Sequence, residues 1–273
     1  MELSWFETLL FGLISGFTEV LPISSLAHQT LFLRLAGAES QVLLRMIARI
    51  GVILAIMTMQ MPLLLRLRRE RRLAAIPKKR RRRNPDPVSM MEVRLLRMAV
   101  MASLVLLLAY PLVHQLYQRL WLLAILVAVN GVIVYVPQYL PSANKRAETL
   151  SALDGMIVGL SSGFGVVPGF SQMGLGLSAA LIRGTQKRYA TDLATLILIP
   201  TLLALTVIDG FALGNLAFTG AMVFHGITVL VASYVAGWLG INLMRSLAFR
   251  IGFSGFAYYC WGFALFALII YLI

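Results

Sequence analysis

Four side chains that can take part in catalysis lie within residues 19–28: Glu19, Ser24, Ser25 and His28. The surrounding segment is apolar, and a carboxylate at membrane depth costs at least ~2.5 kcal/mol, so Glu19 is a functional candidate by default. Glu19 can hold a divalent cation or act as a base, either serine can attack a phosphate or donate to it, and His28 can shuttle a proton. The structural alternative is that both serines cap a short helix after Pro22 and that His28 lies at the interface.

A second cluster of polar and small residues occupies residues 168–176, with Gly169, Ser171, Gln172 and Gly174 as its candidate ligands. Glycines and a small hydroxyl ahead of a helix offer backbone N–H groups to an anion. Such breaks are common in membrane helices, so this motif is weak on its own. Paired with the first cluster, it predicts one pocket built from two opposed hairpins.

The two clusters follow nearly identical phrases, GLISGF at residues 12–17 and GLSSGF at residues 159–164. Helices interrupted at matching places in two halves of a chain mark a binding site inside a membrane protein. A break exposed to lipid would leave backbone groups unpaired, so such segments are buried in protein or line a cavity. We therefore predict that residues 5–35 and 153–182 each form a helix with a re-entrant hairpin.

The composition indicates an integral membrane protein. Apolar residues make up 59% of the chain and charged residues 13%, against about 45–50% and about 25% in soluble domains. The single cysteine, Cys260, excludes an intramolecular disulfide and a cysteine-rich metal site. We predict an all-α fold, a single membrane domain over residues 1–273, with six transmembrane helices at about 43–65, 94–112, 119–139, 189–209, 218–239 and 255–272. In this division repeat one covers 5–65 and repeat two covers 153–209.

The loop at residues 66–93 fixes the expected orientation. It carries 11 Lys and Arg residues between Arg66 and Arg83, which predicts a cytoplasmic location by the positive-inside rule. Both termini and the first cluster then lie on the extracytoplasmic side, and the two repeats enter from opposite faces. We expect the basic loop to contact anionic lipids and not nucleic acid.

At these two motifs the chain resembles the bacitracin-resistance family of undecaprenyl pyrophosphate phosphatases. That family carries Glu-Gly-x-Thr-Glu-x-Leu-Pro-(Val/Ile)-Ser-Ser-Thr-Gly-His in its first repeat and Pro-Gly-x-Ser-Arg-Ser-Gly in its second. The residues that match these motifs are Glu19, Pro22, Ser24, Ser25, His28, Pro168, Gly169, Ser171 and Gly174.

The resemblance implies hydrolysis of a polyprenyl pyrophosphate carrier lipid at the outer face of the bacterial inner membrane. It implies Glu19 as base or metal ligand, Ser25 or Ser171 as nucleophile or donor, and His28 as acid and base. It also implies a divalent cation, Mg²⁺ or Ca²⁺, which the changes described next put in question.

The chain departs from the family motifs at chemical positions. Ser15 replaces a glutamate, Gln172 an arginine and Met173 a serine, while Arg45 and Arg49 stand where the family has an acid and a glutamine. Because Arg45 and Arg49 are four residues apart on a helix, they can present two guanidinium groups to a phosphate. The alternative is that both snorkel to the headgroups.

These departures leave a second function open, in which a non-hydrolytic relative binds or translocates a phosphorylated lipid. A channel or small-solute transporter is disfavoured, because the other candidate acids are predicted near span ends. Those acids are Asp154, Asp192 and Asp209.

Overall fold

The computed structural model describes residues 3–38, 41–113, 116, 118–141, 144–213, 219–250 and 253–272. Within these ranges all regular secondary structure is helical, which confirms the predicted all-α class. The helices are α1 (Trp5–Glu19), α2 (Ser25–Leu35), α3 (Val42–Ala75), η1 (Lys78–Arg80), α4 (Pro87–Leu107), α5 (Tyr110–Val113), α6 (Leu120–Tyr135), η3 (Val136–Tyr139), α7 (Ala152–Phe164), α8 (Gln172–Ile182), α9 (Lys187–Leu213), α10 (Gly220–Arg250) and α11 (Ser254–Leu272).

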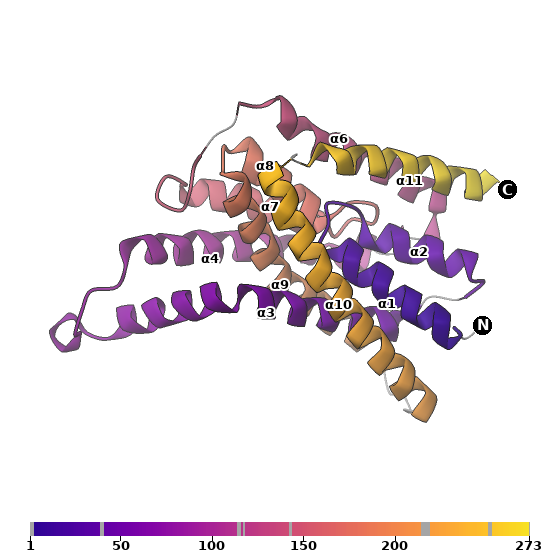
Figure 1. Cartoon of the computed structure of the whole chain (residues 1–273), viewed down its shortest axis with the longest axis horizontal. Coiled ribbons are helices and arrows are strands. Elements are labelled where there is room, and N and C mark those ends of the chain that lie inside the picture. The colour runs from indigo at the N-terminus through magenta and orange to yellow at the C-terminus, as the bar shows by residue number, and fades with distance from the viewer. Residues whose placement is uncertain are drawn as a thin grey trace.

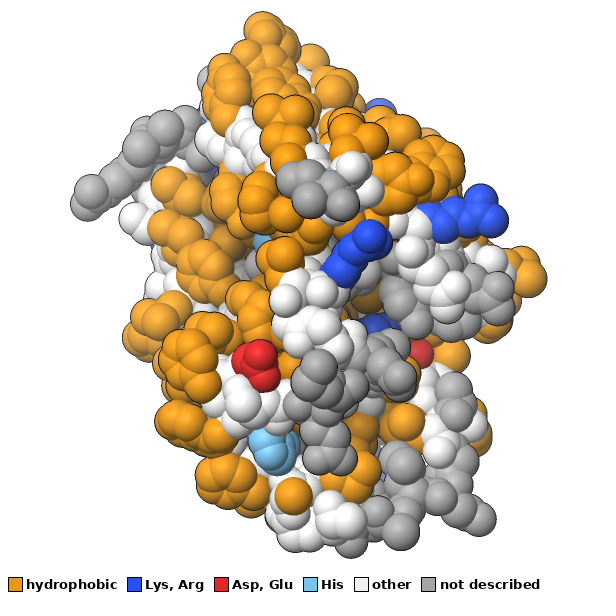
Figure 2. Space-filling view, turned by 90° about the vertical axis from the view of Figure 1, so that its right-hand side faces the viewer, with side chains coloured by type: hydrophobic (Ala, Val, Ile, Leu, Met, Phe, Trp, Pro, Cys, Tyr) orange, Lys and Arg blue, Asp and Glu red, His pale blue; other side chains and the backbone are white. Residues whose placement is uncertain are grey.

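Among the described residues, five helices are long and apolar enough to cross a membrane: Val42–Ala75, Leu120–Tyr139, Lys187–Phe211, Gly220–Leu247 and Ser254–Leu272. They correspond to five of the six predicted spans. The remaining span, predicted at 94–112, coincides with α4 and α5, and the first half of α4 carries Glu92, Arg94 and Arg97. Among the side chains coloured by type in Figure 2, hydrophobic ones are far more abundant than charged ones. The chain is therefore a multi-pass membrane protein.

Each broken segment folds into two helices that pack side by side, α1 with α2 and α7 with α8 (Figure 1). The N-terminal caps of α1 and α7, the first helix of each pair, are of the same kind. Ser4 and Glu7 form a capping box at the start of α1, as Ser151 and Asp154 do at the start of α7. Pro22 lies between α1 and α2, and Gly169, with a φ of 97°, lies between α7 and α8. Both residues lie in the connection after the first helix of each pair, where the chain turns and a continued helix is disfavoured.

The repeated phrase places glycines where helices touch. Gly12 and Gly16 on α1 face α10, and Gly159 on α7 faces α4. A Cβ atom on Gly16 would lie 2.3 Å from the backbone oxygen of Ser233, and one on Gly159 would lie 2.0 Å from that of Ala99. Small residues at such spacing let membrane helices approach closely. The phrase that marks the repeat is thus a packing motif, and the chemical groups follow it.

Each helix pair that packs together has a counterpart related to it by exchanging the two halves of the chain. Helix α1 packs on α10 as α7 packs on α4, α6 packs on α11, and α3 packs on α9. This pattern agrees with an inverted repeat. By these contacts α4 and α6 in the first half match α10 and α11 in the second. The limits of the repeats, 5–65 and 153–209, stay a prediction.

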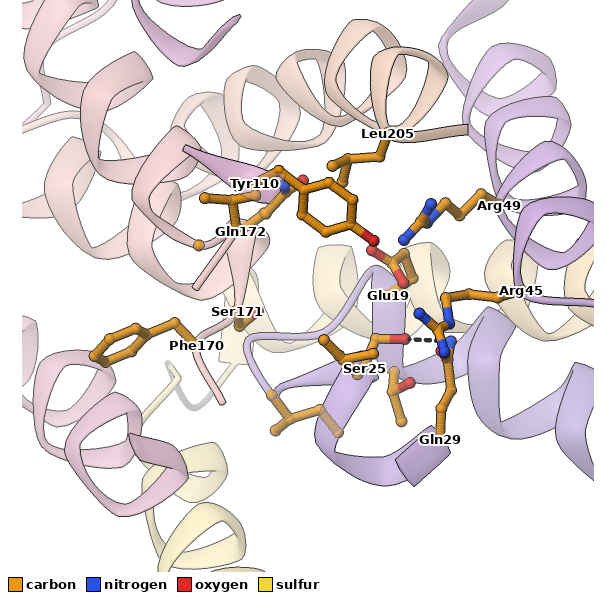
Figure 3. A pocket seen from close by; sticks show the side chains of 15 residues that line it. Glu19, Ser25, Gln29, Arg45, Arg49, Tyr110, Phe170, Ser171, Gln172 and Leu205 are labelled. Carbon is orange, nitrogen blue, oxygen red and sulfur yellow. Dashed lines mark hydrogen bonds between the residues drawn. The ribbon is translucent and has the colours of Figure 1, made fainter. Parts of the chain in front are cut away.

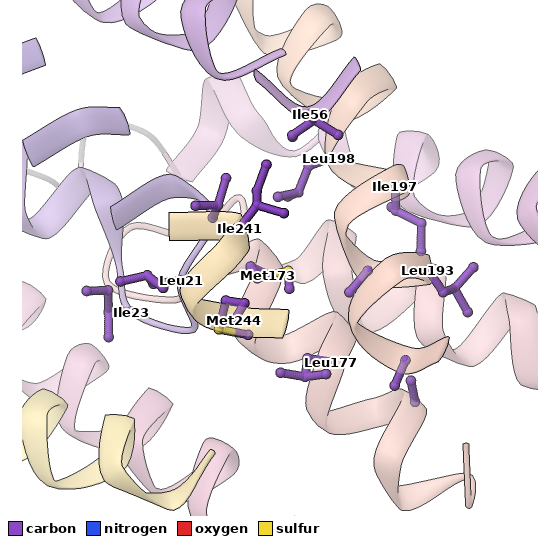
Figure 4. Packing of buried hydrophobic residues seen from close by; sticks show 14 of the residues in the cluster. Leu21, Ile23, Ile56, Met173, Leu177, Leu193, Ile197, Leu198, Ile241 and Met244 are labelled. Atoms are coloured by element: carbon purple, nitrogen blue, oxygen red, sulfur yellow. The ribbon is translucent and has the colours of Figure 1, made fainter. Parts of the chain in front are cut away.

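A buried apolar cluster joins the two halves behind both breaks (Figure 4). Leu21 and Ile23 enter it from the first break, Met173 from the start of α8, and Ile197 from α9. Met173 is 1% exposed, so this departure from the family motif is a core residue. The cluster fixes the position of the polar residues that lie next to these apolar ones.

Helix α3 continues well past its predicted end at residue 65, because Arg, Leu, Glu and Ala all favour helix. At ~1.5 Å per residue, residues 66–75 extend the helix by ~15 Å. Arg66 pairs with Glu92, and Glu70 accepts hydrogen bonds from Arg83, so α3 and α4 are tied together. This basic hairpin projects from one end of the molecule, and both chain ends lie at the other (Figure 1).

We expect Gly159→Leu to destabilise the protein by ~1–3 kcal/mol or more, because the new side chain would overlap the backbone of α4. The matched control is Gly262→Leu on α11, where an added Cβ meets nothing within 4 Å. Thermal unfolding in detergent compares the two variants. Equal shifts in melting temperature would contradict the assigned packing role of the phrase.

Candidate functional site

A small polar cavity lies where the two breaks meet, and we call it the polar pocket (Figure 3). Its volume is about 50 Å³, which is room for a few water molecules or a group of similar size. It is lined by Thr18, Glu19, Ile23, Ser25, Leu26, Gln29, Arg45, Arg49, Tyr110, Gly165, Val166, Phe170, Ser171, Gln172 and Leu205. Both repeats contribute, as the paired motifs predict.

Asn130 on α6 ties the two breaks to each other. Its Nδ2 donates to the carbonyl oxygen of Pro22 at 3.1 Å, and its Oδ1 accepts from the backbone N–H of Ser171 at 3.0 Å. The Ser171 hydroxyl also donates to the carbonyl of Leu21 at 3.0 Å. A Cβ on Gly174 would lie 3.2 Å from Pro22, so the chains are in direct contact. Sequence reasoning missed Asn130, because an isolated Asn in an apolar helix belongs to no local motif.

Two of the four candidate serine hydroxyls, those of Ser24 and Ser171, serve as helix caps. Ser24 Oγ accepts from the backbone N–H of Ala27 at 3.3 Å, and Ser171 Oγ accepts from that of Gly174 at 3.0 Å. Ser25 and Ser171 both line the polar pocket, but the Ser25 hydroxyl does not cap a helix: its Oγ accepts from Gln29 Nε2 at 3.1 Å. The capping alternative therefore holds for Ser24, and Ser25 is the serine available for chemistry.

Glu19 lies at the end of α1, with its carboxylate next to the Ser25 hydroxyl and to the guanidinium groups of Arg45 and Arg49 (Figure 3). Arg45 and Arg49 are 4% and 7% exposed. Neither arginine snorkels to the headgroups, and both point into the polar pocket, as their spacing on α3 predicts. The Glu19 carboxylate, a potential base, thus lies beside the Ser25 hydroxyl, with two guanidinium groups nearby.

Arg49 is held by an acid from the second repeat. Its Nη1 donates to Asp209 Oδ2 at 2.7 Å, and the Tyr110 hydroxyl donates to Asp209 Oδ1 at 2.8 Å. The arginine and aspartate side chains are each 8% exposed. Asp209 lies near the end of its span, as predicted, because the apolar stretch of α9 ends at Phe211. It is nevertheless buried, and it pairs with an arginine of the site.

Two amide side chains in the polar pocket carry atoms without a hydrogen-bond partner among the described residues. These are Gln29 Oε1 and Gln172 Oε1, both buried. Buried polar atoms are nearly always paired, so unpaired ones facing a cavity indicate a ligand or ordered water. Rotating either amide by half a turn presents its NH₂ donors instead. Gln172 stands where the family motif has an arginine, so this position offers hydrogen bonds without a charge.

Three further candidates lie outside the lining of the polar pocket. Ser15 is buried one helical turn before Glu19, and its hydroxyl has no partner among the described residues. Gly169 provides the left-handed turn and packs on Leu126, while Gly174 packs on Pro22. The structure gives these glycines a packing function, and it brings neither to the pocket.

His28 faces a different cavity, which we call the apolar cavity. This cavity has a volume of about 530 Å³ and is lined mainly by apolar side chains of α1, α2, α10 and α11. His28 Nδ1 lies 2.6 Å from the carbonyl of Ser24, which can only accept, so Nδ1 carries the proton. Nε2 then accepts from the Tyr259 hydroxyl at 2.9 Å, and the ring stacks on Phe263. The structure does not bring His28 to the polar pocket.

The side chains of the polar pocket do not fit a metal ion held by the protein. Among the described residues no three His, Cys, Asp or Glu side chains gather at one place. Of the described residues that line the pocket, Glu19 alone has a carboxylate, and it faces two guanidinium groups. Mg²⁺ and Ca²⁺ need several oxygen ligands. The divalent cation and the role of Glu19 as its ligand remain predictions.

The part of the chain that matches known proteins includes both breaks and the residues that line the polar pocket. The family model described as bacitracin resistance protein BacA matches residues 8–266. The chain is 28% identical over 259 residues to an undecaprenyl-diphosphatase of Carboxydothermus hydrogenoformans, with 94% of this chain and 93% of the relative covered. It is 25% identical over 261 residues to one from Methanobrevibacter smithii (93% and 93% covered). Undecaprenyl-diphosphatase 1 of Shouchella clausii is 27% identical over 267 residues (94% and 93%).

Proposed function

Because the chain belongs to the bacitracin resistance protein BacA family, we propose that it removes the terminal phosphate from a polyprenyl diphosphate carrier lipid. The observation that carries the proposal is the set of Ser25, Glu19 and Arg45 in one buried pocket. These residues supply a nucleophile, a base and a cation for phosphoryl transfer. The proposal places the activity in the recycling of cell-envelope carrier lipid.

In the proposed reaction, Ser25 Oγ attacks the terminal phosphorus while its proton passes to Glu19. The bridging P–O bond breaks, polyprenyl phosphate leaves with the proton that Glu19 hands on to it, and a phosphoserine remains. Water then gives a proton to Glu19 as it attacks the phosphorus, and the P–Oγ bond breaks. Ser25 Oγ takes the proton back from Glu19, and inorganic phosphate is released with Ser25 restored. Arg45 stabilises the charge that develops on the phosphoryl oxygens, and Arg49 is held in place for the same task by Asp209.

The apolar cavity supports a lipid with a long hydrocarbon chain as the substrate. It shares Thr18 with the polar pocket, so the two cavities adjoin. Its other lining residues are mostly large apolar side chains such as Leu13, Phe17 and Phe32. A prenyl chain in this cavity would place its phosphate end next to Thr18, at the entrance to the polar pocket.

A non-hydrolytic binder is the second candidate, and a specific observation favours it. With Ser15 and Gln172 in place of the family's glutamate and arginine, the two motifs carry one acid and one arginine fewer than those of the family. The remaining charges, including the Arg49–Asp209 pair, sum to zero. A neutral pocket can hold a phosphate headgroup through hydrogen bonds without activating it.

We propose that the polar pocket opens toward the extracytoplasmic side of the bacterial inner membrane and that the basic hairpin lies in the cytoplasm. The hairpin arginines Arg68, Arg69, Arg71 and Arg72 are exposed at its base. They lie just beyond the apolar part of α3, at the level where anionic headgroups attract basic side chains.

The test measures phosphate release and lipid binding on the same purified protein. Farnesyl diphosphate is supplied with Mg²⁺, with Ca²⁺ and with a chelator. Release of one phosphate per lipid in any of the three conditions supports the enzyme. Binding of farnesyl diphosphate without release in all of them would reject hydrolysis and favour the second candidate.

A further inference from the structure

A third cavity adjoins the polar pocket at Arg45, and we call it the basic cavity. Its volume is about 290 Å³, and its polar lining consists of Thr30, Arg34, Arg45 and Gln118. Arg45 is 4% exposed, whereas Arg34 and Gln118 are exposed. The basic cavity therefore leads from a buried arginine of the polar pocket to the protein surface.

The charges of the basic cavity suit an anion. Two guanidinium groups line it, and among the described residues its lining has no Asp or Glu. Guanidinium groups bind phosphate through charge-assisted hydrogen bonds, and the Gln118 amide can add a neutral donor. In contrast, the polar pocket balances its arginines with Glu19 and nearby Asp209.

The proposed hydrolysis yields two products of opposite solubility, polyprenyl phosphate and inorganic phosphate. The apolar cavity, which shares Thr18 with the polar pocket, suits the first. The basic cavity, which shares Arg45, suits the second. Each product thus has its own cavity next to the site where it forms.

We propose that the basic cavity is a phosphate subsite through which inorganic phosphate leaves the polar pocket, passing from Arg45 to Arg34. The exit role rests on the proposed function, and the phosphate subsite itself does not. Transfer to Arg34 moves the anion away from Ser25 and Glu19, which frees the nucleophile for the next substrate. A phosphate group could also belong to a lipid headgroup, and the experiment separates these sources.

The experiment measures equilibrium binding of radiolabelled inorganic phosphate to the purified full-length protein. We expect Arg34→Gln to weaken phosphate binding by about three- to tenfold, less than for a buried arginine because Arg34 is exposed and screened. The matched control is Arg119→Gln, an exposed arginine next to Gln118 that does not line the cavity. Melting temperatures of both variants verify their folding. Inhibition of lipid hydrolysis by added phosphate should weaken in Arg34→Gln alone.

Equal phosphate affinities in the wild type and Arg34→Gln would contradict the proposed subsite. Equal losses of phosphate affinity in Arg34→Gln and Arg119→Gln would also contradict it. Farnesyl phosphate is measured in parallel. A loss of farnesyl phosphate binding in Arg34→Gln as large as that of inorganic phosphate would assign the cavity to the lipid headgroup and overturn the exit route. If inorganic phosphate binds through Arg34 while the wild type never hydrolyses lipid, the subsite stands and the proposed function fails.

Discussion

Replacing Glu19 with Gln lowers the rate of phosphate release by about 10²–10⁴-fold, the usual contribution of a general base. The amide keeps the size of the side chain and its position between Ser25 and the arginines, but it cannot accept the hydroxyl proton. Binding of farnesyl diphosphate should persist or tighten, because a negative charge has left an anion site. Steady-state phosphate release and a separate binding measurement distinguish the two effects.

The control for Glu19→Gln is Glu148→Gln, which removes an exposed carboxylate from a cavity beside Arg146 and Arg188. It should leave phosphate release unchanged. If Glu19→Gln retained the full rate, Glu19 would not be the base and the proposed proton path would be wrong.

Removing Arg49 alone destabilises the protein by ~3–5 kcal/mol, because the buried Asp209 carboxylate loses its counter-ion. We expect a similar loss of stability in Asp209→Asn, because the buried Arg49 guanidinium then has no counter-ion. The double variant Arg49→Met/Asp209→Asn should recover much of this stability, since no unpaired charge remains and Asn still accepts from Tyr110. Thermal or denaturant unfolding of the four proteins in detergent gives the coupling energy.

Additive losses in that cycle would mean that the 2.7 Å ion pair does not hold Arg49 in place. The double variant also tests function, because it leaves Arg45 as the one arginine in the pocket lining. Weakened diphosphate binding in a stable double variant would show that Arg49 contacts the ligand as well as Asp209.

Much of the fold follows from local patterns in the sequence. Long apolar runs predict the spans because a helix must cover the hydrocarbon core, and the two interrupted segments predict the helix pairs that meet at the site. The four-residue spacing of Arg45 and Arg49 predicts a shared helix face, and both arginines line the polar pocket. The cap function of Ser24 is also a local property, set by its position before α2.

The features that the sequence did not predict are long-range contacts. Asp209 reaches Arg49 across 160 positions of the chain, and Asn130 joins breaks that precede and follow it. No local spacing encodes such pairs, because they depend on how α3, α6 and α9 pack. The sequence also could not predict which cavity His28 faces. His28 and Ser25 are three residues apart on α2, and either could have faced the polar pocket.

The most direct test of the proposed reaction is the search for a phosphorylated serine. Wild type and Ser25→Ala are mixed with farnesyl diphosphate labelled on its terminal phosphate, quenched in acid, and digested for mass spectrometry. The proposed reaction predicts a phosphate on Ser25 in the wild type. In Ser25→Ala it predicts neither a phosphoserine nor phosphate release, although this variant should still bind the lipid. Undiminished phosphate release by Ser25→Ala would contradict it.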